Sequence, residues 1–168
     1  LAAAGNDKTQ LPPRDLVMEA LVEVLEGKRT VHFHTHRHDD ILTALRLQKE
    51  FGFKIVLQHV SEAWKVAEEI AAAKAPSSII MIEAPGGKLE TLDVSMTNGA
   101  ALEKAGALTG FHTDDYITDS RLFLRSAGLA VRNGMSREKA LYGMTMAGAV
   151  MLELDKRIGS LETGMAGE

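Results

Sequence analysis

The stretch that decides the fold is "TVHFHTHRHDDILTALRLQKEFGFKIVLQH", residues 30–59. Its first residues are β-branched or aromatic at alternate positions, a pattern typical of a strand. Apolar residues then recur at helical spacing up to Gly52, which can end a helix, and Asp39 or Asp40 can cap its start. The apolar run over residues 53–59 predicts a second strand. A strand, a helix and a strand in this order predict a parallel β/α unit.

The same alternation extends over most of the chain. We expect helices over residues 14–28, 61–76, 99–106, 120–134 and 136–154, and further strands over residues 77–84 and 107–113. Ser61 can cap the second of these helices, and a long loop over residues 85–98 is a candidate functional segment. The pattern amounts to four strand–helix repeats. A closed barrel needs eight repeats and about 250 residues, so the chain is a small open sheet or about half of a barrel.

We find no internal boundary and predict a single α/β domain over residues 1–168. Residues 1–14 are small and polar and are expected to form a loop or tail, whereas residues 158–168 resemble the start of a segment that breaks off. The first residue is Leu rather than Met, so we expect a piece of a longer or processed protein.

Composition narrows the class of protein. The 168 residues are 45% hydrophobic and carry a net charge of -4, with no basic stripe of the kind that binds nucleic acid. No apolar run approaches the roughly 20 residues of a membrane span, so we expect no membrane partner. Cysteine is absent, which excludes disulfides and thiolate ligands and is compatible with a reducing compartment such as the cytoplasm.

Polar residues gather where the predicted strands end. His32, His34 and His36 lie two apart and would share one face of the first strand. The second strand ends at His59, the third at Glu83, and the fourth is followed by His112, Asp114 and Asp115. Carboxyl ends of parallel strands meet at one edge of a sheet. Histidines and an aspartate at that edge favour a site for zinc, iron or manganese.

Simpler interpretations compete with this one. A single histidine at a strand end is more often hydrogen-bonded or exposed than a metal ligand, and it is the combination with a second histidine and an aspartate that favours metal. We assign His36 and His38 to the loop or to the start of the helix that follows. Asp39 and Asp40 fit a helix cap better than a catalytic pair.

Three segments together carry a family resemblance. They are "VHFHTHRHDDILTALRLQKEFGFKIVLQHVSEAWKVAEEI" (residues 31–70), "GFHTDDYITDSRLFLRSAGLAVRNGMSREKAL" (residues 110–141) and "RIGSLETG" (residues 157–164). In order and spacing they resemble metal-dependent amidohydrolases of the imidazolonepropionase-like kind, and the resemblance runs from about Pro13 to the end. It implies a TIM-type (β/α)8 barrel with one or two divalent metals, most often zinc, at its mouth, and these four strands would be the last four.

Carried over by position, the resemblance implies that His34, His59 and Asp114 are metal ligands, with His32 as the second choice on the first strand. It also implies that Asp114 takes a proton from water during hydrolysis of a C–N bond in a cyclic amide or amino-acid amide, and that His59 holds metal or polarises the carbonyl. Glu83 and the loop after it would contact the small-molecule substrate. The family's first-strand His-x-His, its fourth-strand ligand and its outer β-sandwich have no counterpart in the sequence.

Two functions therefore remain open. The chain is the metal-binding part of an amidohydrolase, or it is a catalytically inactive half-barrel module. In both cases the strand edges near residues 30–36 and 108–111 would be unpaired, so we expect a homo-oligomer or pairing with the missing N-terminal half.

Overall fold

The computed structural model describes residues 13–81 and 88–166. Its strands are β1 (Thr30–Thr35), β2 (Lys54–His59), β3 (Ser77–Ile79) and β4 (Thr109–Phe111). Its α-helices are α1 (Leu16–Leu25), α2 (His38–Phe51), α3 (Ala67–Ala72), α4 (Asn98–Ala105), α5 (Phe123–Arg132), α6 (Arg137–Met144) and α7 (Met146–Met151). Short 3-10 turns, η3 (Ala63–Lys65), η4 (Leu89–Thr91) and η5 (Ser120–Leu122), lie between them.

The four strands form one parallel sheet in the order β1-β2-β3-β4. This confirms the predicted parallel β/α architecture, with β1 and β4 at the two edges of the described sheet. Thr35 of β1 pairs with His59 of β2, so the carboxyl ends of these strands lie level with each other. The loops that follow all four strands therefore meet at one edge, where the candidate site lies.

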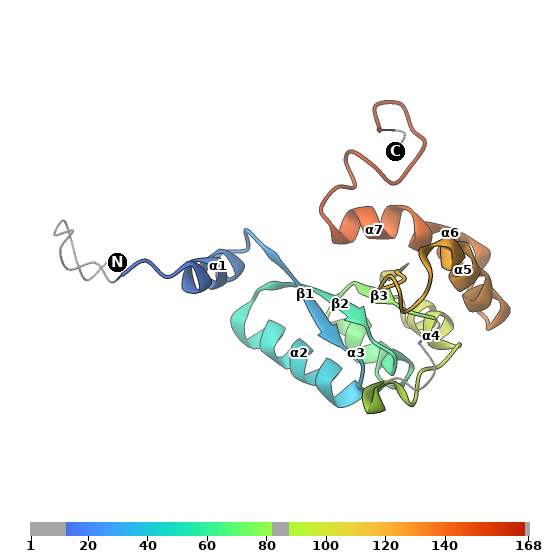
Figure 1. Ribbon diagram of the computed structural model, residues 1–168, viewed down its shortest axis with the longest axis horizontal. Helices are drawn as coiled ribbons and strands as arrows, with labels where there is room; N and C mark the ends of the chain where they lie inside the picture. Colours follow the sequence, from blue (N-terminus) through green and yellow to red (C-terminus); the bar gives the residue numbers. More distant parts are fainter. Residues whose placement is uncertain (1–12, 82–87, 167–168) are drawn as a thin grey trace.

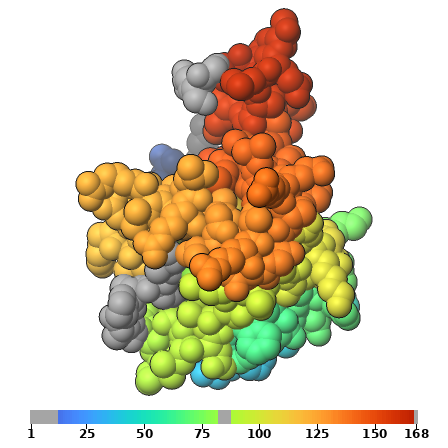
Figure 2. All heavy atoms as spheres, turned by 90° about the vertical axis from the view of Figure 1, so that its right-hand side faces the viewer, coloured from blue at the N-terminus to red at the C-terminus, as the bar shows by residue number. Residues whose placement is uncertain are grey.

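The main core lies between the sheet and the helices that cover it. Ile41 of α2, Leu57 of β2, Ile70 of α3 and Leu102 of α4 are fully buried in one apolar cluster. A second, smaller cluster joins Val56 on β2 to α7. Figure 1 shows α2 and α3 running beside the strands and α5, α6 and α7 gathered on the right, where all three contact β4. Figure 2 shows the face that these last three helices build, with the C-terminal segment (red) projecting beyond it.

The helix caps differ in part from the predictions. Helix α2 starts at His38, one residue before Asp39, and its cap position is Arg37, whose own side chain makes no capping bond; the first amide, of His38, donates to the carboxylate of Glu62. The predicted capping by Asp39 or Asp40 is therefore wrong: both lie in the first turn, where negative charge favours the helix dipole, and Asp39 pairs with Arg37. Gly52 ends α2 with φ 73°, as predicted, because glycine has no Cβ to clash there.

Two predicted helices are broken, and a proposed cap is absent. The segment 61–76 forms η3 and then α3, and Ser61 is fully buried and bonded to His36 instead of capping a helix. The segment 136–154 divides into α6 and α7 at Thr145, whose φ of -128° and ψ of -93° are not helical. Strands β3 and β4 are shorter than predicted, and Glu83 lies outside the described residues.

Helix α1 stands apart from the sheet (Figure 1). Asp15 caps it through bonds from Val17 and Met18, but within the described structure none of residues 16–25 is buried. Six of its apolar side chains are at least half exposed: Leu16, Val17, Met18, Leu21, Val22 and Leu25. The described helices include none with both the length and the apolar character that a membrane span requires.

Candidate metal centre

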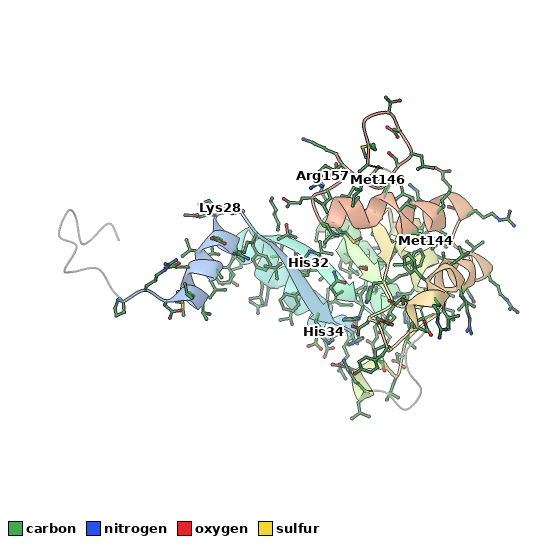
Figure 3. All side chains as sticks on the ribbon, turned by 45° about the horizontal axis from the view of Figure 1, so that its top comes forward. Lys28, His32, His34, Met144, Met146 and Arg157 are labelled. Atoms are coloured by element: carbon green, nitrogen blue, oxygen red, sulfur yellow. The ribbon has the colours of Figure 1, made fainter. Side chains whose placement is uncertain are left out.

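Three histidines converge at the carboxyl edge of β1 and β2. His34, His36 and His59 each offer a ligand atom, and these atoms lie within 4.8 Å of one another. The ring centroids are 4.5 Å apart for His34 and His59 and 4.8 Å apart for His36 and His59. Figure 3 shows His34 close to the end of β1, with His32 behind it on the same strand. The structure thus brings together two of the three predicted ligands and adds His36.

A local reversal of the backbone brings His59 into this group. In the sheet register His34 pairs with Gln58, so regular alternation would turn His59 to the opposite face from His34. His59 instead has φ 69°. Positive φ rotates the Cβ about the N–Cα bond by roughly half a turn relative to extended backbone, which carries the ring to the face of His34.

The next residue shares this unusual conformation. Val60 has φ 41°, which is strained for a β-branched side chain. Its amide donates to the carbonyl of Thr35 and its own carbonyl accepts from the side-chain amide of Asn98, both at 2.8 Å. Asn98 is completely buried, so the strand end is fixed from both sides in the geometry that presents His59.

Hydrogen bonds set the orientation of two of the imidazoles. Nδ1 of His36 lies 2.8 Å from the hydroxyl of Ser61. Nδ1 of His59 lies 2.9 Å from Nε2 of His112, whose Nδ1 lies 2.8 Å from the hydroxyl of Ser78. When the Nδ1–H of His59 donates to His112, Nε2 of His59 carries the lone pair. This arrangement of an engaged Nδ1 and an outward Nε2 is the usual one for metal-binding histidines.

Two carboxylates border the histidines. Oδ2 of Asp114 lies 4.0 Å from Nδ1 of His59, on an exposed turn where Asp114 has φ 50°. Oε1 of Glu90, carried by η4, lies 3.9 Å from Nε2 of His34 and 3.8 Å from Nε2 of His36. Asp114 was predicted from the sequence, whereas Glu90 was not. Glu90 belongs to the long loop that was predicted to be functional, and its spacing from the histidines carries no recognisable motif.

Burial lowers the pKa values of His36, His59 and His112, which keeps these three histidines neutral near pH 7. Loss of solvent around His36, aided by the nearby His59, lowers its pKa to about 4. Burial also lowers the pKa of His112 to about 4, and it lowers the pKa of His59, where His34 acts in the same direction. Neutral imidazole is the form that binds a metal. Imidazole nitrogens beside carboxylate oxygens fit zinc and other first-row divalent metals, so the residues present suit the metal that the resemblance implies.

The other histidines of the run have different partners. Nδ1 of His32 lies 2.8 Å from the side-chain nitrogen of Gln58, one pleat away from the cluster. His38 starts α2, and its Nδ1 lies 2.5 Å from the carboxylate of Glu62, which also pairs with Lys65. An open hollow of about 570 Å³ lies beside His59, with Asp114 and Phe123 among its lining residues.

Several solved structures of other proteins are similar to this chain. The chain is similar over 99% of its length to the crystal structure of an amidohydrolase from Thermotoga maritima, with 34% identity and a TM-score of 0.91, and it spans 44% of that chain. A zinc-bound adenosine deaminase from Xanthomonas campestris matches 89% of this chain at 20% identity, with 38% of its own length covered and a TM-score of 0.61. A metal-dependent hydrolase from Pyrococcus horikoshii matches 90% at 19% identity, with 35% of its own length covered and a TM-score of 0.65.

The similarities to the Xanthomonas deaminase and to the Pyrococcus hydrolase concern the fold alone. No protein-family model and no curated protein matches the sequence. The predicted resemblance to metal-dependent amidohydrolases is confirmed by the similarity to the Thermotoga protein, and the chain has the architecture of part of a TIM-type barrel. It spans less than half the length of the Thermotoga protein.

Proposed function

We propose that this chain is the metal-binding part of an amidohydrolase that hydrolyses the C–N bond of a cyclic amide or an amino-acid amide. The observation that carries the proposal is the convergence of His34 and His59 at the carboxyl edge of the sheet, on a fold similar to that of the Thermotoga amidohydrolase. We propose His34, His59 and Asp114 as ligands of a divalent metal, most simply zinc, within a single partial domain over residues 1–168.

A divalent metal at such a site lowers the pKa of water and polarises a carbonyl group. The side chains supply the rest of the chemistry. Asp114 is exposed on a turn beside His59, where its carboxylate can take a proton from water and return it to the leaving nitrogen. His112 and Ser78 hold His59 in one orientation through their hydrogen bonds. The hollow beside Asp114 and Phe123 offers room for a small substrate.

Hydrolysis tests this proposal directly. The chain is loaded with Zn²⁺, mixed with an N-terminal barrel fragment from a superfamily relative, and assayed against cyclic amides and N-acyl amino acids. We expect activity that needs the metal and falls at least about 100-fold in Asp114→Asn, in line with the loss of a general base. Asp115→Asn, the neighbouring exposed carboxylate, is the matched control. Activity that survives both a chelator and Asp114→Asn would contradict the proposal.

An inactive half-barrel module is the second candidate. It is favoured by the exposed apolar side chains of α1 and by the two edges, β1 and β4, of the described sheet. Such surfaces promote pairing with a second copy or with the missing half. Analytical ultracentrifugation of the chain, alone and with the N-terminal fragment, measures this association. Assembly that buries α1 but hydrolyses none of the amides would favour the inactive module.

A further inference from the structure

We propose that His36 is a further metal ligand, so that His34, His36 and His59 hold one divalent transition metal within two neighbouring strands of this chain. The inference rests on the proposed function and deepens it, because it identifies which side chains retain the ion and separates them from the residue that moves the proton. It replaces the expectation that His36 belongs only to the loop before α2.

The first argument is convergence. A tetrahedral ion bonded to nitrogens at about 2.0–2.1 Å places those nitrogens roughly 3.3 Å apart. The ligand atoms of the three histidines lie within 4.8 Å of one another, so modest movement, chiefly of the exposed His34 side chain, brings them toward bonding distance. The rings of His34 and His36 are 4.9 Å apart and nearly perpendicular, and those of His36 and His59 are 4.8 Å apart and stacked, so the three rings form one compact group.

The second argument is orientation. Nδ1 of His36 is engaged by Ser61, and Nδ1 of His59 is engaged by His112. Ser61 is fully buried, and His36 is 2% exposed, so this ring has little freedom to turn. Two of the three imidazoles thus have their Nδ1 atoms held by partners, which leaves the Nε2 atoms as the ligating positions.

The third argument is the position of Glu90. Its Oε1 lies 3.8 Å from Nε2 of His36 and 3.9 Å from Nε2 of His34, so both nitrogens face the same carboxylate oxygen. The Nε2 atoms therefore point toward the mouth of the sheet and not into the apolar core. Lys88 lies 3.4 Å from that oxygen and is more than half exposed, so it can move away when a cation enters.

Asp114 is placed differently. Its carboxylate is 4.0 Å from Nδ1 of His59, the nitrogen that is bonded to His112, and not within the group formed by the three histidines. The side chain is half exposed, which suits a residue that exchanges protons with water. The geometry assigns retention of the metal mainly to the histidines and proton transfer to Asp114.

Metal titration of the purified, metal-stripped chain tests the inference. Zn²⁺ is followed by calorimetry, and Co²⁺ by its visible absorption. We expect one ion per chain and a loss of affinity of at least about tenfold in His36→Gln, comparable with that in His34→Gln. Asp114→Asn, whose carboxylate lies at the margin of the cluster, should weaken binding less than His36→Gln does. His32→Gln and His38→Gln, from the same run of sequence but outside the cluster, are the matched controls, and far-UV circular dichroism checks that each variant is folded.

A second measurement needs no variant. Long-range ¹H–¹⁵N NMR spectra of the wild-type imidazoles should show Zn²⁺-induced shifts at three Nε2 atoms. Two results would overturn the inference and leave the proposed function standing. One is an affinity that drops in Asp114→Asn but not in His36→Gln. The other is a set of Nε2 shifts at only two histidines. Failure of the wild-type chain to bind Zn²⁺ would overturn it too, because the site would not be self-contained. The hydrolysis assay of the assembled barrel judges the proposed function independently.

Discussion

The stability of the metal-free chain should fall as the pH drops from about 7.5 to about 5, and His36 should account for a measurable share. Its pKa is about 4 in the folded chain, against 6.5 for the free side chain, because burial excludes water from the ring. Between these values the unfolded chain binds a proton at His36 and the folded chain does not. Because only the unfolded chain gains this proton, the free energy of unfolding falls as the pH falls. At pH 5 the loss due to His36 alone is about 2 kcal/mol.

Other groups do not mask this effect. The lowered pKa values of His59 and His112 act in the same direction and add to the loss in wild type. The pKa values of Glu62 and Asp39 are lowered from 4.5 and 3.8, so their stabilising contributions are lost mainly below the chosen window. Urea denaturation with a chelator present, at both pH values, measures the free energy of unfolding in wild type and in His36→Gln.

Measuring both proteins at both pH values separates the effect of protonating His36 from the effect of replacing its ring. The variant at about pH 7.5 reports the cost of replacing the ring, because His36 is neutral in both states there. We expect the decrease in stability between the two pH values to be smaller in His36→Gln than in wild type by about 2 kcal/mol. Equal decreases in the two proteins would refute the reasoning, since His36 would then gain its proton equally in the folded and unfolded chains.

Three further changes test the scaffold. Asn98→Ala should cost about 1 kcal/mol in urea denaturation and weaken Zn²⁺ binding, because it removes one of the two donors to the carbonyl of Val60 and leaves only the amide of Ala63. Gly143→Ala should cost about 1–3 kcal/mol, since a Cβ would lie 2.8 Å from the ring of Phe111; an unchanged midpoint would show that the ring moves freely. Leu21→Lys, on exposed α1, should change stability by no more than about 0.5 kcal/mol but reduce the mass of any oligomer in ultracentrifugation.

The fold followed from local patterns, and the errors occurred where distant contacts decide the outcome. Apolar spacing and Gly52 are enough to predict β1, α2 and β2. The division of 136–154 into α6 and α7 was not predictable from spacing, because the apolar pattern continues through Thr145. The role of Ser61 depends on a bond to His36, which is 25 positions away in the sequence.

The candidate site was harder to predict from local sequence patterns than the fold was. Alternation placed His32, His34 and His36 on one face but could not separate His32 from the other two or relate any of them to His59, because the position of His59 depends on one positive φ at the end of β2. Asn98 and the pairing of Val60 with Thr35 hold that conformation, and neither is visible in a motif.

The site residues lie on different strands of the sheet, and their positions indicate that metal binding and hydrolysis depend on different parts of the barrel. The three histidines come from β1, β2 and the loop between β1 and α2, so their positions depend on one pair of strands with a six-residue register. Asp114 follows β4, two strands away, and reaches the group only at its margin. Metal binding is therefore expected to need only the β1–β2 pair and its supports. Under the proposed function, hydrolysis would also need the edge of the barrel to be closed by the added N-terminal fragment, so we expect the chain alone to bind metal without turning over substrate.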